Sequence, residues 1–166
     1  MTDLALFAIA PLLLLAAALA FLSRPGRRPG ALPRLAEGAT LAAVACAAAG
    51  IVQLLLAGPQ VMQLGETALL RLDPVSATMA LLVTFVGWVV VRYARRYLDG
   101  EAREGAFHGL MLAAIAAVLV LVQAANLPVM IAAFVATGLV LRRLLLFYPD
   151  RAEARRAAAK FIRVWG

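Results

Sequence analysis

A few residues with side chains able to hold or move a charge stand within or beside apolar stretches of the sequence. They are Asp73, His108, Thr137, Arg142 and Arg143. Ionisable groups inside a membrane are energetically costly, so such residues are the usual candidates for ion and proton pathways. We therefore predict that these five are the transport residues of this chain.

Each ionisable candidate also has a structural interpretation. Asp73 precedes Pro74 and is expected to cap a helix, because the helix dipole favours a carboxylate there; the alternative is a proton entry path. His108 is expected to be an interfacial polar residue, with a proton relay as the alternative. Arg142 and Arg143 are expected to reach the lipid headgroups. Alternatively, one of them faces the bundle and tunes a charge on another helix or on a partner subunit.

The sequence lacks the motifs of the common enzyme classes, including phosphate-binding glycine loops, HExxH, CxxC and GxSxG. One histidine and one cysteine, Cys46, cannot build a metal cluster or a disulfide within the chain. We expect no cofactor, no metal and no enzymatic activity. Cys46 is expected to pack as a small apolar residue. The neutral polar residues of the apolar stretches are expected to form interhelical or backbone hydrogen bonds; they are Gln53, Thr84, Gln123 and Thr137.

The composition shows which elements must position these residues. The chain has 166 residues, 64% of them hydrophobic and 15% charged, and its mean hydropathy is +0.92. Soluble domains have about 45–50% apolar and about 25% charged residues, which excludes a soluble enzyme. The apolar residues form runs long enough to cross a bilayer as helices. The sequence predicts an all-α, polytopic transmembrane bundle with helices over 4–22, 39–57, 74–91, 106–123 and 128–148.

Two connections between these helices have features of their own. The stretch 61–73 contains Gly65 and is compatible with a short β-hairpin. The connection around Asn126 is so short that the helices on either side are expected to be antiparallel neighbours.

The charges predict how the chain crosses the membrane. Of the 16 basic residues, all but Arg71 fall on one side of a five-helix arrangement. The positive-inside rule then places the N-terminus outside and the C-terminus in the cytoplasm. The net charge of +7 is thus a sign of topology, with the lipid bilayer and not nucleic acid as the partner. Residues 1–149 form the transmembrane region, and 150–166 form a cytoplasmic amphipathic tail or the start of a truncated sixth helix.

Several stretches, taken in order, resemble the antiporter-like subunits of respiratory complex I. The string LDPVSATM at 72–79, continued by VTFVG at 83–87, resembles their third helix. The string YARRYLDG at 93–100 resembles the following loop, and AANL at 124–127 resembles the turn before the fifth helix. Residues 157–162 resemble the approach to a sixth helix. The resemblance extends without gaps from about Leu72 to Ile162.

Within that superfamily, the strings at 92–100 and 144–151 are most similar to the DabB branch, the membrane subunits of a two-component inorganic carbon pump. The resemblance implies a multi-pass protein of the bacterial inner membrane through which cations or protons pass. It also implies a peripheral zinc-containing partner of the DabA type, which handles carbon dioxide or bicarbonate, and further membrane helices as partners.

The sequence departs from the family at two points. Phe134 and Val135 occupy the positions of a tryptophan and of the glutamate that conducts protons in the complex I subunits. The family subunits also have more than twice as many helices, so we expect an N-terminal fragment, a truncated product or one part of a split subunit. Two alternatives are a proton-translocating subunit of NADH-quinone oxidoreductase or of an Mrp antiporter, and a small membrane scaffold or assembly protein without transport activity.

Overall fold

Five long helices and one β-hairpin are the main elements of the part of the chain that the structure describes. The computed structural model describes residues 5–23, 32–97, 104–147, 156, 159–161 and 163–164. The elements follow one another as α1 (Ala5–Leu22), α2 (Leu32–Ala57), β1 (Gln60–Leu64), β2 (Thr67–Leu72), α3 (Pro74–Tyr97), α4 (Glu104–Gln123) and α5 (Leu127–Leu145). All five predicted apolar segments are helical, which confirms the all-α bundle.

The helices have the dimensions of membrane spans. Four are long and apolar enough to cross a bilayer, namely Arg34–Ala57, Pro74–Tyr97, Glu104–Gln123 and Leu127–Leu145. The fifth contains the shorter apolar stretch Ala8–Leu22. The chain is therefore a polytopic membrane protein. Of the predicted tail 150–166, the structure describes only 156, 159–161 and 163–164, and these residues are helical.

Some helix ends differ from the predicted bounds. The helix expected at 39–57 begins at Leu32, and the helix expected at 74–91 continues to Tyr97. Apolar runs mark only the part of a helix that lies in hydrocarbon, whereas the hydrogen-bonded backbone continues into the polar headgroup region. The last helix ends at Leu145 and not at the predicted 148, a position that lies outside the described residues.

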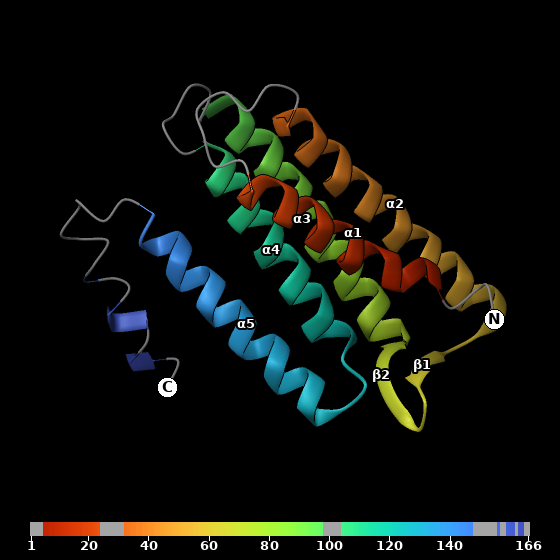
Figure 1. Cartoon of the computed structure of the whole chain (residues 1–166). Coiled ribbons are helices and arrows are strands. Elements are labelled where there is room, and N and C mark those ends of the chain that lie inside the picture. The colour runs from red at the N-terminus through yellow and green to blue at the C-terminus, as the bar shows by residue number, and fades with distance from the viewer. Residues whose placement is uncertain are drawn as a thin grey trace.

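Helix α4 is the centre of the bundle. It packs against α1, α3 and α5, and it has a smaller contact with α2 (Figure 1). Helix α5 packs on α4 at the edge of the bundle. The main core cluster combines small and large side chains, from Ala18, Phe21, Ala43, Leu112 and Ala116 among others. Cys46 packs against this cluster and is a free thiol, as predicted.

The hairpin expected within 61–73 is present as an antiparallel pair of strands with a register shift between Met62 and Gln63. Its turn includes Gly65 at a φ of 64°, a backbone conformation that favours glycine. The hairpin is attached to two other elements. Gln53 Nε2 of α2 donates to Gln60 Oε1 over 2.9 Å. The backbone N–H of Ala125, after α4, donates to the carbonyl oxygen of Leu69 over 3.0 Å.

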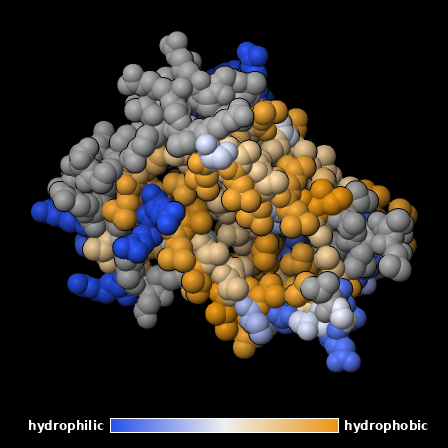
Figure 2. All heavy atoms as spheres, in the orientation of Figure 1, coloured by the Kyte–Doolittle hydropathy of each residue, from blue (hydrophilic) through white to orange (hydrophobic). Residues whose placement is uncertain are grey.

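The two ends of the bundle differ in charge. One end, here called the basic end, has six described arginines, which are Arg34, Arg92, Arg95, Arg96, Arg142 and Arg143. There the carboxylate of Glu37 joins α2 to α3 through Arg95, at 2.5 Å. The opposite, hairpin end has the strands and the turn 124–126. Figure 2 shows apolar residues over most of the visible face, with hydrophilic residues toward its margins. This distribution suits a protein surrounded by hydrocarbon.

The contact between α1 and α4 at Gly109 is tight, and a side chain there would press on α1. A Cβ atom added there would lie 3.1 Å from the Cβ of Phe21 and 3.2 Å from the carbonyl oxygen of Ala18. We expect Gly109→Ala to lower the free energy of unfolding by about 1–2 kcal/mol, because overpacking forces the helices apart. The measurement is reversible unfolding in mixed micelles, followed by circular dichroism.

Gly38→Ala is the matched control, because a Cβ atom at Gly38 would meet nothing within 4 Å. We expect this second variant to be at least as stable as the wild type, since alanine is the better helix former. Equal losses in the two variants would contradict the packing argument.

Candidate functional site

The five predicted transport residues do not converge on one site. Asp73 lies at the hairpin end, whereas His108, Arg142 and Arg143 lie at the basic end. Thr137 lies within α5 and is buried. The roles of these five residues in transport stay predictions.

Asp73 caps α3. Its Oδ1 accepts a hydrogen bond from the backbone N–H of Ser76 at 2.6 Å, and Ser76 Oγ in turn accepts from the backbone N–H of Asp73 at 2.9 Å. This reciprocal pair satisfies backbone donors that the first helical turn leaves free. The guanidinium of Arg71 lies 3.2 Å from Asp73 Oδ2. The structure thus agrees with the capping interpretation of Asp73.

These contacts stabilise the charged form of Asp73. The backbone N–H of Ser76, its hydroxyl and the cation of Arg71 together hold the pKa of the Asp73 carboxyl below its usual value, and partial burial opposes them. The carboxylate is therefore ionised at neutral pH.

His108 is buried more deeply than an interfacial residue. Its side chain has no exposed surface, and neither ring nitrogen has a hydrogen-bond partner among the described residues. The side chain of Glu104, one helical turn earlier, is only 2% exposed, and its Oε1 lies 3.9 Å from His108 Nε2. Our sequence reasoning assigned Glu104 to a loop and missed this pair. The signal that reveals it is the spacing of four residues, which places both side chains on the same face of a helix.

The neutral polar residues mostly form bonds within their own elements. Thr137 Oγ1 donates to the carbonyl oxygen of Ala133 over 2.8 Å, and Thr84 Oγ1 donates to that of Ala80 over the same distance. The predicted backbone hydrogen bonds of these threonines are thus confirmed. The expected hydrogen bond is missing at one atom of Gln123, because its buried Oε1 has no hydrogen-bond partner in the described part of the chain.

Arg142 and Arg143 are exposed at the basic end of α5. Neither is in an ion pair with a described residue. Val135 is 50% exposed and faces the same side of α5 as Arg142, whereas Gly138 is buried toward the bundle. Gly138 lies beside the face shared by Val135 and Arg142, since a spacing of three residues turns the helix by about 300°. Phe147, after α5, packs edge-on against Phe107 with a centroid distance of 5.3 Å.

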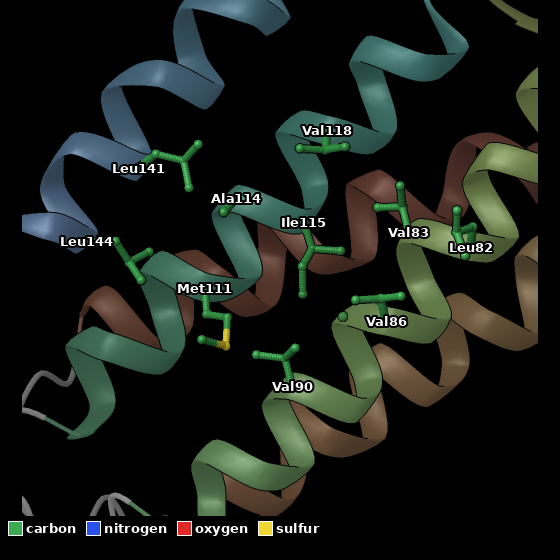
Figure 3. A pocket seen from close by; sticks show the side chains of 11 residues that line it. Leu82, Val83, Val86, Val90, Met111, Ala114, Ile115, Val118, Leu141 and Leu144 are labelled. Carbon is green, nitrogen blue, oxygen red and sulfur yellow. The ribbon is translucent and has the colours of Figure 1, made fainter. Parts of the chain in front are cut away.

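An open groove of about 430 Å³ lies between α3, α4 and α5 (Figure 3). It is lined only by apolar residues, with Val86, Met111, Val118 and Leu141 among them. The sequence does not reveal it, because three helices contribute its walls. A groove without polar groups suits apolar chains and does not solvate an ion.

The described residues contain no group of three or more His, Cys, Asp or Glu side chains that could hold a metal ion. The chemistry that these residues offer is therefore acid–base and electrostatic. It resides in Asp73 at one end, and in Glu104, His108 and the arginines at the other.

Two comparisons relate this arrangement to known proteins. A family model described as the N-terminus of chain 5 of NADH-ubiquinone oxidoreductase (complex I) matches residues 62–108. The probable inorganic carbon transporter subunit DabB2 of Halothiobacillus neapolitanus is 33% identical in an alignment over 131 residues that covers 73% of this chain. The chain spans 24% of the length of that relative. It is thus similar to the N-terminal part of the antiporter-like subunits and to a DabB-type subunit, as the sequence motifs predicted.

The capping role of Asp73 predicts a pH-dependent stability. Asp73→Ala is expected to lower the free energy of unfolding by about 1 kcal/mol at neutral pH, because the cap is lost. The pKa of Asp73 is lower in the folded than in the unfolded state, so its contribution is complete above the unfolded pKa. It is lost as the pH falls through the folded pKa. In unfolding experiments at a series of pH values, wild type and variant should therefore begin to converge near pH 4 and should coincide only below the folded pKa of Asp73.

Asp73→Asn serves as the control, because asparagine is also a good N-cap but does not ionise. We expect it to be more stable than Asp73→Ala and to respond less to acid than the wild type. A constant difference between wild type and Asp73→Ala from neutral to acidic pH would show that the charge contributes nothing.

Proposed function

We propose that this multi-pass bacterial membrane protein, which resembles the N-terminal part of antiporter-like subunits, forms that part of a cation- or proton-coupled inorganic carbon uptake complex. The observation that carries the proposal is the 33% identity to DabB2 over 131 residues. That relative is described as a subunit of an inorganic carbon transporter. The membrane-embedded helices and the hairpin would be the front portion of the corresponding membrane subunit here.

The chain acts in this proposal as a framework and not as an enzyme. Its partner would be a peripheral zinc-containing subunit of the DabA type, which handles carbon dioxide or bicarbonate. Further membrane helices would cover part of its apolar surface. The exposed apolar side of α5, with Ile131, Phe134, Val135 and Leu139, supports a location against lipid or other helices. Asp73, His108, Arg142 and Arg143 would serve such a complex from the two polar ends of the bundle, and Thr137 would serve it from within α5.

A second candidate function is that of a proton-translocating subunit in NADH-quinone oxidoreductase or a multi-subunit cation/proton antiporter. The match of residues 62–108 to the complex I family model favours it. Val135 is an argument against it, because a branched apolar side chain cannot bind the proton that the family's glutamate at this position holds.

A chimera tests the proposal directly. The matching N-terminal segment of DabB2 is replaced by this chain, and the chimera is expressed with the DabA-type partner in a host that lacks carbonic anhydrase. We expect growth in air, because the complex supplies the host with inorganic carbon. Growth rate in air relative to growth in elevated carbon dioxide is the measurement.

Unaltered DabB2 with its partner is the positive control, and the chimera without the partner is the negative control. Membrane fractions verify that the chimera inserts at the level of DabB2. An inserted chimera that does not grow in air, beside a positive control that does, would contradict the proposal. Rescue of an antiporter-deficient host by the same chimera would favour the second candidate.

A further inference from the structure

A second groove lies between α1 and α2, toward the basic end of the bundle. Its volume is about 380 Å³, and it is open to the surroundings of the bundle. From α1 it is lined by four residues whose spacing places them on one face of the helix, namely Leu13, Ala17, Ala20 and Phe21. Between Leu13 and Phe21 the groove follows α1 for about 12 Å. It is therefore an elongated groove along the helix axis.

Small residues create this groove. Ala17 and Ala20 line it from α1, and Gly38 and Ala39 line it from α2. A Cβ atom added at Gly38 would meet no other atom within 4 Å, so the groove is open at this residue. The two helices nevertheless pack against each other. The hollow is therefore a feature of a formed helix–helix contact.

The surface of α1 and α2 is apolar where it is exposed. Leu12 and Leu19 of α1 have more than half of their surface exposed, and so do Leu35 and Leu41 of α2. Exposed apolar side chains of this size are stable in hydrocarbon and not in water. We therefore expect the acyl chains of the bilayer to reach the groove.

Arg34 is the one ionisable residue among the described residues that line the groove. It is exposed, and it forms no ion pair with another described residue. The nearest carboxylate along α2, that of Glu37, pairs with Arg92 and Arg95 of α3 instead. Helix stabilisation does not account for Arg34, because the helix dipole disfavours a cation in the first turn of α2. The guanidinium is thus available to an anion.

We infer that this groove binds one anionic phospholipid, with an acyl chain between α1 and α2 and the phosphate on Arg34. A guanidinium binds phosphate oxygens through two parallel hydrogen bonds. A zwitterionic headgroup adds a cation to the phosphate, and none of the described lining residues has a carboxylate to pair with that cation. The charge of the site therefore selects a lipid with a net negative charge.

The larger groove between α3, α4 and α5 lacks this feature, because its described lining residues are all apolar. It gives no preference for one headgroup over another. An apolar helix of a partner would fill the groove between α1 and α2 but would leave Arg34 without an anion beside hydrocarbon, which is costly. The inference does not rest on the proposed function, since the groove and its arginine belong to this chain in any complex.

The test maps bound lipid by photocrosslinking in the full chain, reconstituted in nanodiscs of phosphatidylcholine. Two probes have the same diazirine-labelled acyl chain, one on phosphatidylglycerol and one on phosphatidylcholine. Mass spectrometry gives the crosslinking yield of each probe at Leu13, Ala17 and Ala39. We expect the glycerol-to-choline ratio of these yields to be about fivefold higher than on the exposed side of α5, at Ile131 and Phe134. The reason is the attraction of one arginine for an anionic lipid.

Variants separate the charge from the groove. Arg34→Gln is expected to lower the ratio to the value found on α5, whereas Arg34→Lys keeps the charge and should retain most of the preference. Arg96→Gln removes an exposed charge that does not line the groove, so the ratio should stay as in the wild type. Gly38→Phe fills the groove and should abolish crosslinking of both probes at Leu13 and Ala17, whereas Gly38→Ala leaves room for the acyl chain.

Three results would overturn the inference. The first is a wild-type ratio in the groove equal to that on α5, which indicates lipid bound without regard to charge. The second is an absence of crosslinks in the groove, which indicates that protein occupies it. The third is a ratio that Arg34→Gln does not change. The wild-type and Arg34→Gln measurements decide even where Gly38→Phe does not fold.

Discussion

The bilayer core offers no water to the backbone, and the rest of the structure depends on this constraint. Each N–H and C=O group within the hydrocarbon must find its partner inside the chain, so the apolar stretches become helices. Hydroxyl groups obey the same constraint, since Thr84 and Thr137 donate to carbonyl oxygens of their own helices. Among the described residues, the only strands are at the hairpin end, outside the four spans identified by length and hydropathy. Polar chemistry is thereby confined to the two ends of the bundle.

When the backbone hydrogen bonds of each helix are formed within that helix, the helices associate in lipid mainly through close packing of their side chains. Small residues provide that fit where α1 meets α4, at Ala18 and Gly109. A second close approach occurs at Gly87 of α3, where a Cβ atom would lie 2.7 Å from Ile115 Cδ1. Both approaches involve α4, which explains why this helix is central. The same close fit seals Glu104 and His108 from lipid and water, so the packing of the bundle produces the one buried ionisable pair that the structure describes.

Much of the fold could be predicted from the sequence because hydrophobic runs and turn residues act locally. The five helices, the hairpin turn at Gly65 and the cap at Asp73 all follow from neighbouring residues. The prediction failed where several elements cooperate. Glu104 was assigned to a loop because the apolar run begins after it, whereas in the structure it opens α4 and is buried. The groove between α3, α4 and α5 was not predicted for the same reason, since three helices together form its walls.

The two ends of the bundle are held together by different kinds of interaction. At the hairpin end, the side chain of Asn126 accepts from the backbone N–H of Val129 and donates to the carbonyl oxygen of Ala68. These bonds are neutral, whereas the cap of α3 at the same end is charged, since Asp73 pairs there with Arg71. At the basic end, the ion pairs of Glu37 with Arg92 and Arg95 join α2 to α3, and Glu104 and His108 form a buried pair within α4. The strands of the hairpin end link α2 to the turn between α4 and α5. The apolar side of α5 lies between these ends without an ionisable group, so a cation path along α5 would need polar groups from outside the described residues.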